Sequence, residues 1–389
     1  MKKNFGNRKR LKIGVVAAGY DGFADIFPGV FKKINRIQAE FIRYGMDANI
    51  ISVPYGMSLA DKVRRRLPFG GDGCDWHILS ETEWDVLYIR RPQFISSGFV
   101  SALKNVKSKY PETLILLEYP TYPYAGEYRS LFNLPILLKD TINKRKLKKV
   151  VDRIVDLSQH DVIDKIKTIQ IINGIDLNEV RPRVPRPENP KKLELVMAAS
   201  FAPWHGADRL LRGLGEYNGS TPITVHLVGD GSESKKLKRI VKDLGIQDSV
   251  VFHGWLGAEQ MNKIYNESTL GVGCLAITRK GPILDSSLKT REYLAKGLPF
   301  IYADKVDVMQ REPADFCLEV EAGEAPIRFD DIVAFWKELY RDGETSVVER
   351  TRSYAERNVG MPATMASVES FIVDYFDPNK RKSSSLGGM

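Results

Sequence analysis

The stretch Arg181-Pro-Arg-Val-Pro-Arg-Pro-Glu-Asn-Pro190 lies near the middle of the chain and holds four prolines in ten residues. Proline has no backbone N–H and a fixed φ angle, so this stretch cannot form a helix or a central strand. The same alternation of short apolar runs and longer amphipathic stretches occurs before and after it. We interpret residues 181–192 as a linker between two domains.

The alternation predicts the class of fold. The short apolar runs predict strands at 12–18, 48–53, 86–89, 113–117, 153–157, 168–172, 193–198, 224–228, 250–253, 270–274 and 300–303. The amphipathic stretches predict helices at 26–43, 98–109, 137–151, 207–214, 234–244, 258–266 and 288–296. Buried parallel strands joined by crossover helices have this pattern. The sequence therefore predicts an α/β fold with two Rossmann-like, doubly wound parallel sheets facing across a cleft.

The expected domains follow from the position of the linker. We predict an N-terminal domain over residues 1–180 and a C-terminal domain over residues 193–360. An apolar helix at 363–376 is expected to pack back onto the N-terminal domain. Residues 377–389 end in a Lys-, Ser- and Gly-rich segment and are expected to be disordered. Ligands of doubly wound sheets bind at the carboxyl ends of the strands, so polar residues that follow the predicted strands are the candidate ligand contacts.

Composition narrows the class of protein. The three cysteines lie far apart, which fits a reducing compartment and gives no metal or redox spacing. The apolar run near the N-terminus is short and predicts a first strand rather than a signal peptide, and no run is long enough to span a membrane. The net charge is +9, but no nucleic-acid-binding motif is present. We expect a cytoplasmic protein that does not bind nucleic acid.

Two basic segments suggest a membrane surface. Arg64–Arg66 and Lys144–Lys149 are interleaved with or followed by Leu67, Phe69 and Leu147. Basic and apolar residues together favour an anionic membrane interface. The alternative is that both segments are solvated helix faces, and the sequence leaves this open.

The segment Leu284–Pro299 is the strongest candidate for a ligand site. Ser286 or Ser287 is a suitable N-cap, so the first turn with Leu288 and Lys289 can meet a phosphate. Glu292 lies on the apolar stripe of the same helix, where a carboxylate needs a partner or a ligand such as a ribose. The alternative is an ion pair of Glu292 with one of the neighbouring basic residues Lys289, Arg291 and Lys296.

Three glycines follow predicted strands. Gly19 follows the first strand, and Gly229 and Gly231 follow the strand at 224–228. Glycine lets the backbone approach a ligand closely, so these are candidate donor-binding positions. Simple tight turns are the alternative, because the full G-x-G-x-x-G fingerprint is absent.

Two further loops carry candidate chemistry. His205 and Arg209 are four residues apart, so on a helix they can face one phosphate. Glu118 is a candidate catalytic carboxylate, and the tyrosines that follow it are candidates for stacking on an acceptor sugar: Tyr119, Tyr122 and Tyr124. A structural role for each loop is the alternative. We expect no metal, because the aspartate-x-aspartate motif of the other common transferase fold is absent.

Several of these segments together resemble glycosyltransferase family 4. The similar pieces of the second half are Ile172-Asn-Gly-Ile-Asp176, Trp204-His-Gly-Ala-Asp-Arg-Leu-Leu211, Leu227-Val-Gly-Asp-Gly231, Phe252-His-Gly254 and Glu292-Tyr-Leu-Ala-Lys-Gly-Leu-Pro299. Two pieces of the first half look like bacterial capsule and exopolysaccharide members: Tyr88-Ile-Arg-Arg91 and Glu118-Tyr-Pro-Thr-Tyr-Pro-Tyr124.

The resemblance implies a GT-B fold and a retaining, metal-independent sugar transfer without a cofactor. It implies that Glu292 holds the donor ribose, that residues 286–289 meet the donor phosphates or sugar, and that Gly19 approaches the diphosphate. The partners would be a nucleotide sugar, a glycan or lipid-linked saccharide acceptor, and an anionic membrane surface at the cytoplasmic face. The alternatives are a nucleotide-sugar epimerase of the same fold and a non-catalytic nucleotide-sugar-binding partner.

The sequence departs from the family in two places. The family usually has a Glu eight positions before the ribose Glu, where this chain has Leu284 with Asp285 beside it. The family's Arg and Lys after the first strand of the donor domain are also missing, near Ser200 and His205. We expect His205 and Arg209 to replace that positive charge, with Lys289 and Arg291 as further candidates.

Overall fold

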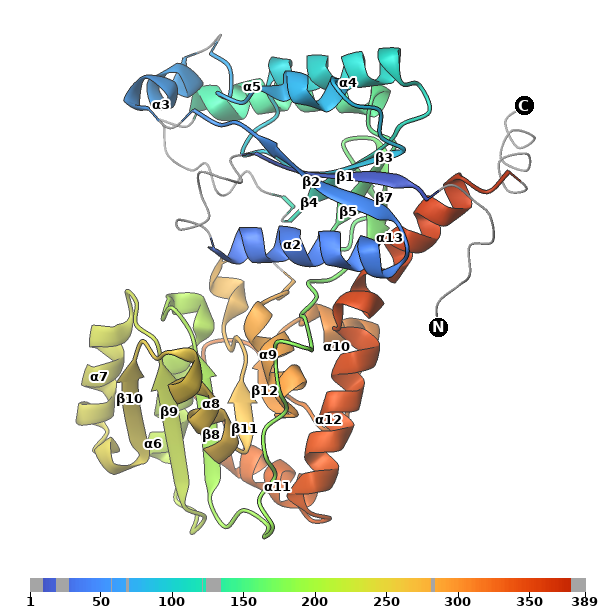
Figure 1. Ribbon diagram of the computed structural model, residues 1–389. Coiled ribbons are helices and arrows are strands. Elements are labelled where there is room, and N and C mark those ends of the chain that lie inside the picture. Colours follow the sequence, from blue (N-terminus) through green and yellow to red (C-terminus); the bar gives the residue numbers. More distant parts are fainter. Residues whose placement is uncertain are drawn as a thin grey trace. The chain divides into compact units, whose positions relative to one another are not determined.

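The computed structural model describes residues 10–18, 28–56, 58–67, 70–120, 122–123, 134–280 and 284–378. The chain divides into two compact units, coloured along the sequence in Figure 1. Residues 1–171 with 364–389 form the first unit, and residues 172–363 form the second. Gly19, Tyr124 and residues 379–389 of the expected tail lie outside the described residues.

The first unit is built on a seven-stranded sheet in the order β2-β1-β3-β4-β5-β7-β6. Its strands are β1 (Lys12–Ala18), β2 (Asp47–Val53), β3 (Val86–Arg90), β4 (Leu114–Tyr119), β5 (Arg153–Asp156), β6 (Val162–Ile163) and β7 (Ile166–Gln170), and all paired strands are parallel except β6 with β7. Its helices are α2 (Pro28–Arg43), α3 (Leu59–Arg66), α4 (Ser97–Lys109), α5 (Leu134–Lys144) and α13 (Met361–Tyr375). Figure 1 shows α2 on one face of this sheet and α4 and α5 on the other.

The second unit is built on a six-stranded parallel sheet in the order β10-β9-β8-β11-β12-β13. Its strands are β8 (Leu193–Ala198), β9 (Ile223–Val228), β10 (Val250–Gly254), β11 (Leu270–Val272), β12 (Phe300–Ala303) and β13 (Leu318–Val320). Its helices are α6 (Ala207–Glu216), α7 (Ser234–Asp243), α8 (Ala258–Glu267), α9 (Leu288–Lys296), α10 (Asp307–Arg311), α11 (Phe329–Leu339) and α12 (Glu344–Asn358). The predicted pair of doubly wound parallel sheets is therefore confirmed.

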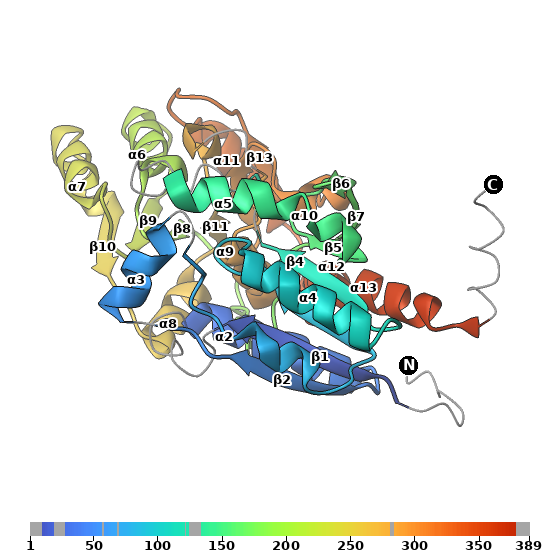
Figure 2. The ribbon, with the colours of Figure 1, turned by 90° about the horizontal axis from the view of Figure 1, so that it is seen from above.

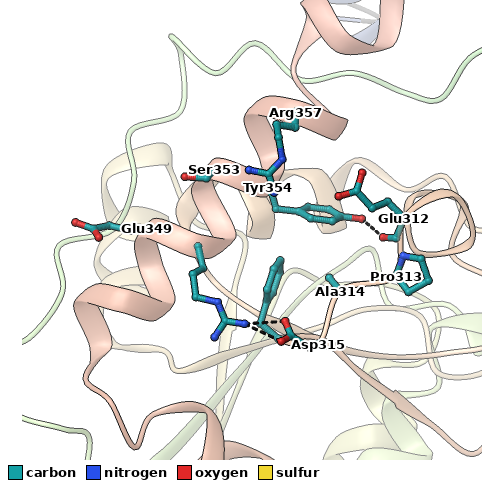
Figure 3. Close-up of a pocket in the computed structure, with 10 residues that line it drawn as sticks. Glu312, Pro313, Ala314, Asp315, Glu349, Ser353, Tyr354 and Arg357 are labelled. Atoms are coloured by element: carbon teal, nitrogen blue, oxygen red, sulfur yellow. Dashed lines mark hydrogen bonds and ion pairs between the residues drawn. The ribbon is translucent and has the colours of Figure 1, made fainter.

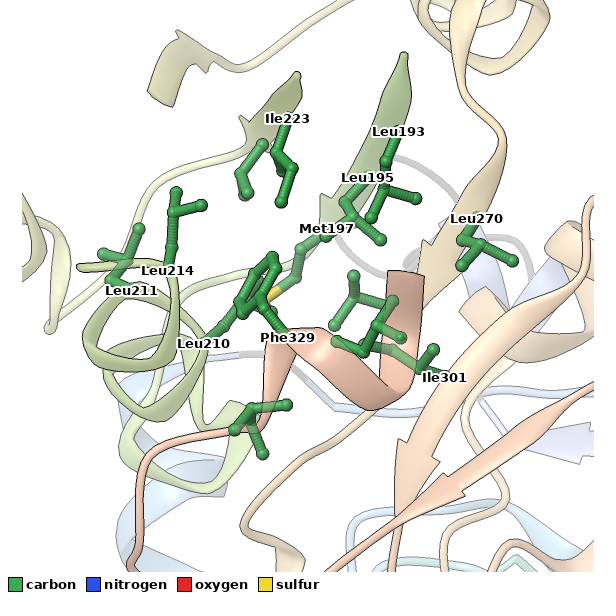
Figure 4. Close-up of a cluster of buried hydrophobic side chains, with 14 of the residues drawn as sticks. Leu193, Leu195, Met197, Leu210, Leu211, Leu214, Ile223, Leu270, Ile301 and Phe329 are labelled. Carbon is green, nitrogen blue, oxygen red and sulfur yellow. The ribbon is translucent and has the colours of Figure 1, made fainter. Parts of the chain in front are cut away.

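Helices cover both faces of each sheet, which explains why the strands read as continuous apolar runs. In the second unit, Leu193, Leu195 and Met197 alternate along β8 and are buried. Figure 4 shows these three side chains grouped with Leu210 and Leu214 of α6. This packing holds α6, and the loop before it, over the end of β8.

The proline-rich stretch, which we expected to be a linker between the domains, packs against the second unit. Its Arg183 is fully buried and donates hydrogen bonds to the Glu344 carboxylate and, at 2.7 Å, to the Tyr340 hydroxyl. Arg186 also donates to Glu344, at 2.9 Å from its Nε. As predicted, the stretch forms neither helix nor strand, but two arginines fix it to α12 and the preceding turn.

The helix expected at 363–376 is α13, and residues 364–389 group with the first unit. The guanidinium of Arg153 at the start of β5 lies 4.9 Å from the centre of the Phe371 ring of α13. The helix expected at 137–151 instead ends at Lys144 and is followed by a 3-10 turn, Leu147–Lys149. Leu147 of this turn is fully buried in the core of the first unit, just before β5 begins.

Candidate functional site

Helix α9 is the crossover that connects β11 to β12, so it begins at the carboxyl edge of the second unit's sheet. Ser287 is its N-cap residue, but the side chain makes no capping hydrogen bond. The Ser287 hydroxyl is buried and has no hydrogen-bond partner among the described residues. The first turn of α9 therefore keeps N–H groups that no side chain caps, and the helix dipole favours an anion there.

Lys289 lies in this first turn. Its Nζ is shielded from solvent and donates to no oxygen or nitrogen atom of the residues with a described position; the Cys274 thiol lies beside it. A buried ammonium without a partner costs roughly several kcal/mol, so the site favours occupation by an anion. Burial raises the pKa of the neighbouring Cys274 thiol to about 11, with the charge of Lys289 acting in the opposite direction.

His205 ends the 3-10 turn Pro203–His205, which follows β8. Its Nδ1 accepts a 3.0 Å hydrogen bond from the Ala202 N–H, so the neutral ring carries its proton on Nε2. Burial, and next the charge of Lys289, lower the pKa of His205 to about 4. At neutral pH His205 is therefore an uncharged donor beside Lys289.

Lys280 adds a second positive charge to this group. Its Nζ lies 5.4 Å from the centre of the Trp204 ring, and its charge contributes to the lowered pKa of His205. Sequence reasoning missed Lys280, because only the 3-10 turn Ile277–Lys280 brings it back to the loop after β8. Lys280, Lys289 and the start of α9 together supply positive potential beside the loop that follows β8.

The loop before α9 is fixed by its own polar contacts. Asn173 donates from Nδ2 to the Ser286 carbonyl at 2.9 Å and to its Oγ at 3.3 Å. Asp285 accepts a 2.9 Å hydrogen bond from the Ser287 N–H with one carboxylate oxygen. The other oxygen is buried and has no partner in the described part of the chain. The Leu288 side chain, in contrast, is 54% exposed.

Glu292 lies one turn after Leu288 and is half-buried. Burial, and next the Glu292 carboxylate, raise the pKa of the Tyr265 hydroxyl on α8. The carboxylate therefore lies beside Tyr265 while part of the side chain remains accessible.

Two of the basic neighbours considered for Glu292 have other partners. Arg291 is fully buried and pairs with Asp307, which is also fully buried. Lys296 donates a 2.5 Å hydrogen bond to the Asn262 side chain. Arg291 is therefore structural, which removes it from the candidates for diphosphate binding.

Arg209 does not have the environment that we expected of a phosphate ligand. It is 1% exposed, and its guanidinium donates to the carbonyl oxygens of Leu275, Glu321 and Ala325. Each guanidinium nitrogen makes one of these bonds, which tie α6 to the loop after β11 and to the loop between β13 and α11. These contacts favour a structural arginine, and the expected phosphate role stays a prediction, because an arginine can satisfy backbone carbonyls as well as a phosphate.

Gly229 and Gly231 also have a structural role. A Cβ at Gly229 would lie 2.0 Å from the Ala199 carbonyl oxygen, and one at Gly231 would lie 2.4 Å from that of Phe201. Gly229 also has a φ of 114° and donates its N–H to the Gly254 carbonyl. The close approach of the backbone after β8 accounts for both glycines without a ligand, and their expected donor-binding role stays a prediction.

In the first unit, Glu118 lies at the end of β4 and is fully buried. Its carboxylate accepts hydrogen bonds from the Tyr88 hydroxyl at 2.6 Å and from Arg90 at 2.9 Å, and Lys33 Nζ lies 2.9 Å away. Burial alone would raise the pKa of Glu118, but Lys33, Arg90 and Tyr88 outweigh it and lower the pKa to about 2. The carboxylate is a paired structural anion, which disagrees with the catalytic role expected from the sequence.

Glu118→Gln is expected to lower the free energy of unfolding at pH 7 by roughly 3 kcal/mol, the equivalent of the pKa shift. The pKa of Glu118 is depressed in the folded state, so its contribution is complete above its ordinary value of 4.5 and is lost as the pH falls toward 2. Urea unfolding between pH 7 and pH 3 measures this. The exposed Glu83→Gln is the control, and equal stability of the two variants would contradict the prediction.

The tyrosines after Glu118 fall into two groups. Tyr119 is fully buried, and its hydroxyl donates to Asp164 at 3.1 Å, so it does not present a ring for sugar stacking as we expected. Tyr122 is half-buried, with its ring 5.0 Å from that of His160 in an edge-on contact. Tyr122 therefore remains a candidate acceptor contact, while Tyr124 and Gly19 lie outside the described residues.

A separate hollow of about 500 Å³ lies between α12 and the segment from Glu312 to Phe316 (Figure 3). Arg350 donates to Asp315 at 2.7 Å across it, and the Tyr354 hydroxyl donates to the Glu312 carbonyl. None of the candidate site residues lines it. The hollow is bridged by its own side chains, and none of its lining residues carries a buried polar side-chain atom without a partner among the described residues.

Comparisons with known proteins test the expected fold and class. Residues 181–276 match the family model described as glycosyl transferases group 1. The family match and the fold together identify the chain as a glycosyltransferase. No curated protein matches the chain significantly.

Solved structures of glycosyltransferases share the fold of the whole chain. A glycosyltransferase from Rickettsia africae ESF-5 has a TM-score of 0.63 at 14% identity, covering 95% of this chain and 100% of that one. Sucrose-phosphate synthase from Thermosynechococcus elongatus has a TM-score of 0.58 at 12% identity, covering 94% and 99%. Anabaena HepE, in complex with UDP and glucose, has a TM-score of 0.55 at 13% identity, covering 94% and 100%. At these identities the similarities establish the GT-B fold alone.

No helix within the described ranges is both long and apolar enough to cross a membrane.

Proposed function

We propose that the chain is a retaining, metal-independent transferase of glycosyltransferase family 4. It moves a sugar from a nucleotide-sugar donor to a glycan or lipid-linked glycan in polysaccharide biosynthesis, as capsule and exopolysaccharide enzymes do. The observation that carries the donor site is the unpartnered, buried Nζ of Lys289 at the uncapped start of α9. A diphosphate supplies the anion that this position lacks.

The nucleotide is proposed to be UDP. Anabaena HepE, which has the same fold, is described with UDP and glucose bound. The ribose hydroxyls would donate hydrogen bonds to Glu292, one turn beyond the diphosphate on α9. The loop of residues 284–287 would lie against the sugar, with the free oxygen of Asp285 as an acceptor for a sugar hydroxyl.

The reaction breaks the bond between the anomeric carbon and the diphosphate oxygen. The acceptor hydroxyl bonds to that carbon, and its proton passes to the departing diphosphate oxygen. Negative charge builds on the departing diphosphate. Lys289, Lys280 and the start of α9 would stabilise that charge, and His205 would donate a neutral Nε2–H. Such fixed donors can take the place of a metal ion in stabilising the leaving group, and on this basis we propose that transfer requires none.

We also place the reaction at the cytoplasmic face of an anionic membrane, where lipid-linked acceptors are found. The exposed basic residues around α3 and at the end of α5 support this location. It also agrees with the net charge of +9.

A screen over UDP-, GDP- and dTDP-sugars, read by thermal shift and by donor hydrolysis, tests the function. A donor at about a hundred times its Kd stabilises the folded protein by about 2.7 kcal/mol. Turnover that persists with EDTA supports metal independence. Donor-sugar interconversion without an acceptor would instead identify an epimerase, and stabilisation without any turnover would identify a non-catalytic binding protein.

Glu292→Ala is expected to weaken nucleotide binding about tenfold to a hundredfold, because charge-assisted hydrogen bonds contribute roughly 1.5–3 kcal/mol each. Calorimetric titration with UDP measures this, and Glu292→Gln should lose less. If Glu292 only supports the structure beside Tyr265, Glu292→Ala will lower the melting temperature and leave the UDP affinity unchanged. That result would refute the assignment.

A further inference from the structure

The first unit carries a concentration of exposed apolar side chains on α3 and α5. Of thirteen exposed large hydrophobic residues in the described ranges, six belong to α3, its C-cap and α5. They are Leu59, Val63, Leu67, Leu134, Leu138 and Ile142, and each is at least 50% exposed. Scattered exposed apolar residues are ordinary, but a grouped set marks an interaction surface.

The spacing of these residues makes one stripe on each helix. Leu59, Val63 and Leu67 are four residues apart, and so are Leu134, Leu138 and Ile142. Positions i, i+4 and i+8 lie on nearly the same side of a helix. Each stripe is therefore an amphipathic face that turns its apolar side to solvent instead of to the core.

The two helices are held next to each other. Lys139 of α5 donates from Nζ to the carbonyl oxygens of Arg65, Leu67 and Gly70, at 2.5, 2.9 and 2.9 Å. Figures 1 and 2 both show α3 beside one end of α5. The two stripes therefore belong to one fixed element of the first unit, with no rearrangement needed to bring them close.

Positive charge surrounds the stripes. Lys62, Arg64 and Arg66 are exposed on α3, and the exposed bases after α5 are Arg145, Lys146, Lys148 and Lys149. The acids on the two helices are occupied, since Asp61 binds the Ser58 N–H and Asp140 pairs with Arg91. An unpartnered apolar surface rimmed by bases fits an anionic lipid surface.

Two residues of the expected membrane segments do not take part. Arg65 is buried and donates to the Tyr55 hydroxyl, and Leu147 is buried in the core of the unit. Of the apolar residues expected to accompany the bases, Leu67 is 52% exposed and belongs to the α3 stripe, Leu147 is buried, and Phe69 lies outside the described residues. The other residues of the two stripes were not anticipated from the sequence.

We infer that α3 and α5 together form a membrane-docking face, whose aliphatic stripes enter the interfacial layer of an anionic bilayer while the surrounding bases contact lipid headgroups. The inference rests on the proposed membrane location, but not on the donor chemistry of α9. A second copy of the chain is a poorer occupant. A symmetric dimer through this face would bring its two sets of bases together, and like charges across an interface oppose binding.

The test is sedimentation of the full chain with vesicles of phosphatidylcholine containing about one third phosphatidylglycerol. The pair Leu59→Gln with Val63→Gln, and the pair Leu138→Gln with Ile142→Gln, should each weaken binding about tenfold or more. Ile42→Gln, on α2 and 52% exposed, is the matched control and should bind as the wild type does. Arg64→Gln with Arg66→Gln should reduce binding and its dependence on salt.

Thermal unfolding and donor binding of each variant are measured in parallel, so a folding defect or a failed donor proposal is seen separately. Loss of vesicle binding with an unchanged melting temperature and donor affinity supports the docking face. If the glutamine pairs bind as the wild type does while the arginine pair does not, adsorption is purely electrostatic and the inference is wrong. A concentration-dependent dimer that the glutamine pairs dissociate, without vesicle binding, would overturn it in favour of a second copy.

Discussion

Lys289→Ala is expected to lower kcat at saturating donor by about two to three orders of magnitude, the usual cost of losing one charged or hydrogen-bonding group that stabilises a transition state. The Lys289 ammonium is buried and makes no hydrogen bond to an oxygen or nitrogen atom of the described residues, and the buried Asp285 carboxylate and the Cys274 thiol lie near it. Lys289 lies in the first turn of α9, where the helix dipole acts in the same direction. Charge that grows on a departing diphosphate is therefore stabilised more in the transition state than in the bound donor.

Three further variants calibrate this result. Lys289→Arg should retain part of the activity, because the charge remains although its shape changes. Lys280→Ala should cost less, since Lys280 is exposed and solvent screens its charge. Lys263→Ala, on the surface of α8, is the matched control and should not change kcat. An unchanged kcat for Lys289→Ala would show that charge on the leaving group is stabilised elsewhere.

The behaviour of His205 with pH gives an independent check on the same site. Burial and the charge of Lys289 hold the pKa of His205 near 4, so the residue is neutral throughout the range from pH 6 to pH 8. The pH profile of kcat/KM, which reports on the free enzyme, should therefore show no step from His205 in that range. In Lys289→Ala the pKa of His205 should rise, because a nearby positive charge has been removed.

The arrangement of strands was predictable because it depends on local patterns. β8 is observed at the predicted residues 193–198 and α9 at 288–296. Both are decided by apolar runs and by end signals such as Ser287 and Gly297. Helix α3 was not expected, since its apolar residues Leu59 and Val63 face solvent and no core pattern marks it. The helices α11 and α12 were also not expected.

The site was less predictable, because its chemistry depends on long-range neighbours. Lys289 could be predicted as a donor-binding residue because it lies two residues after the N-cap Ser287 in the sequence. Whether Arg209 meets a phosphate or carbonyl oxygens depends on loops more than sixty residues away, at Leu275 and Ala325. In the same way, Gly229 lies against the backbone of Ala199, a contact that the sequence around Gly229 does not reveal. A sequence motif records which residues are present but not which groups they contact.

Arg209→Met is expected to lower the free energy of unfolding by about 3 kcal/mol or more while leaving the kcat of the folded protein within severalfold of the wild type. The guanidinium of Arg209 satisfies carbonyl oxygens of Leu275, Glu321 and Ala325, and each buried polar group left without a partner costs about 1–3 kcal/mol. Methionine keeps most of the apolar volume, so the change removes hydrogen bonds rather than packing.

Arg212→Met is the matched control on the same helix. Arg212 is 42% exposed and pairs with Asp208 at 2.7 Å, and exposed pairs contribute about 1 kcal/mol or less. Urea unfolding gives the difference in stability, and a donor assay on the same samples gives kcat. The two roles of Arg209 predict opposite results: a structural arginine lowers stability and spares kcat, whereas a diphosphate ligand spares stability and lowers kcat by about a hundredfold or more. The second result would restore Arg209 to the leaving-group site, and the carbonyl contacts would then describe only the state without donor.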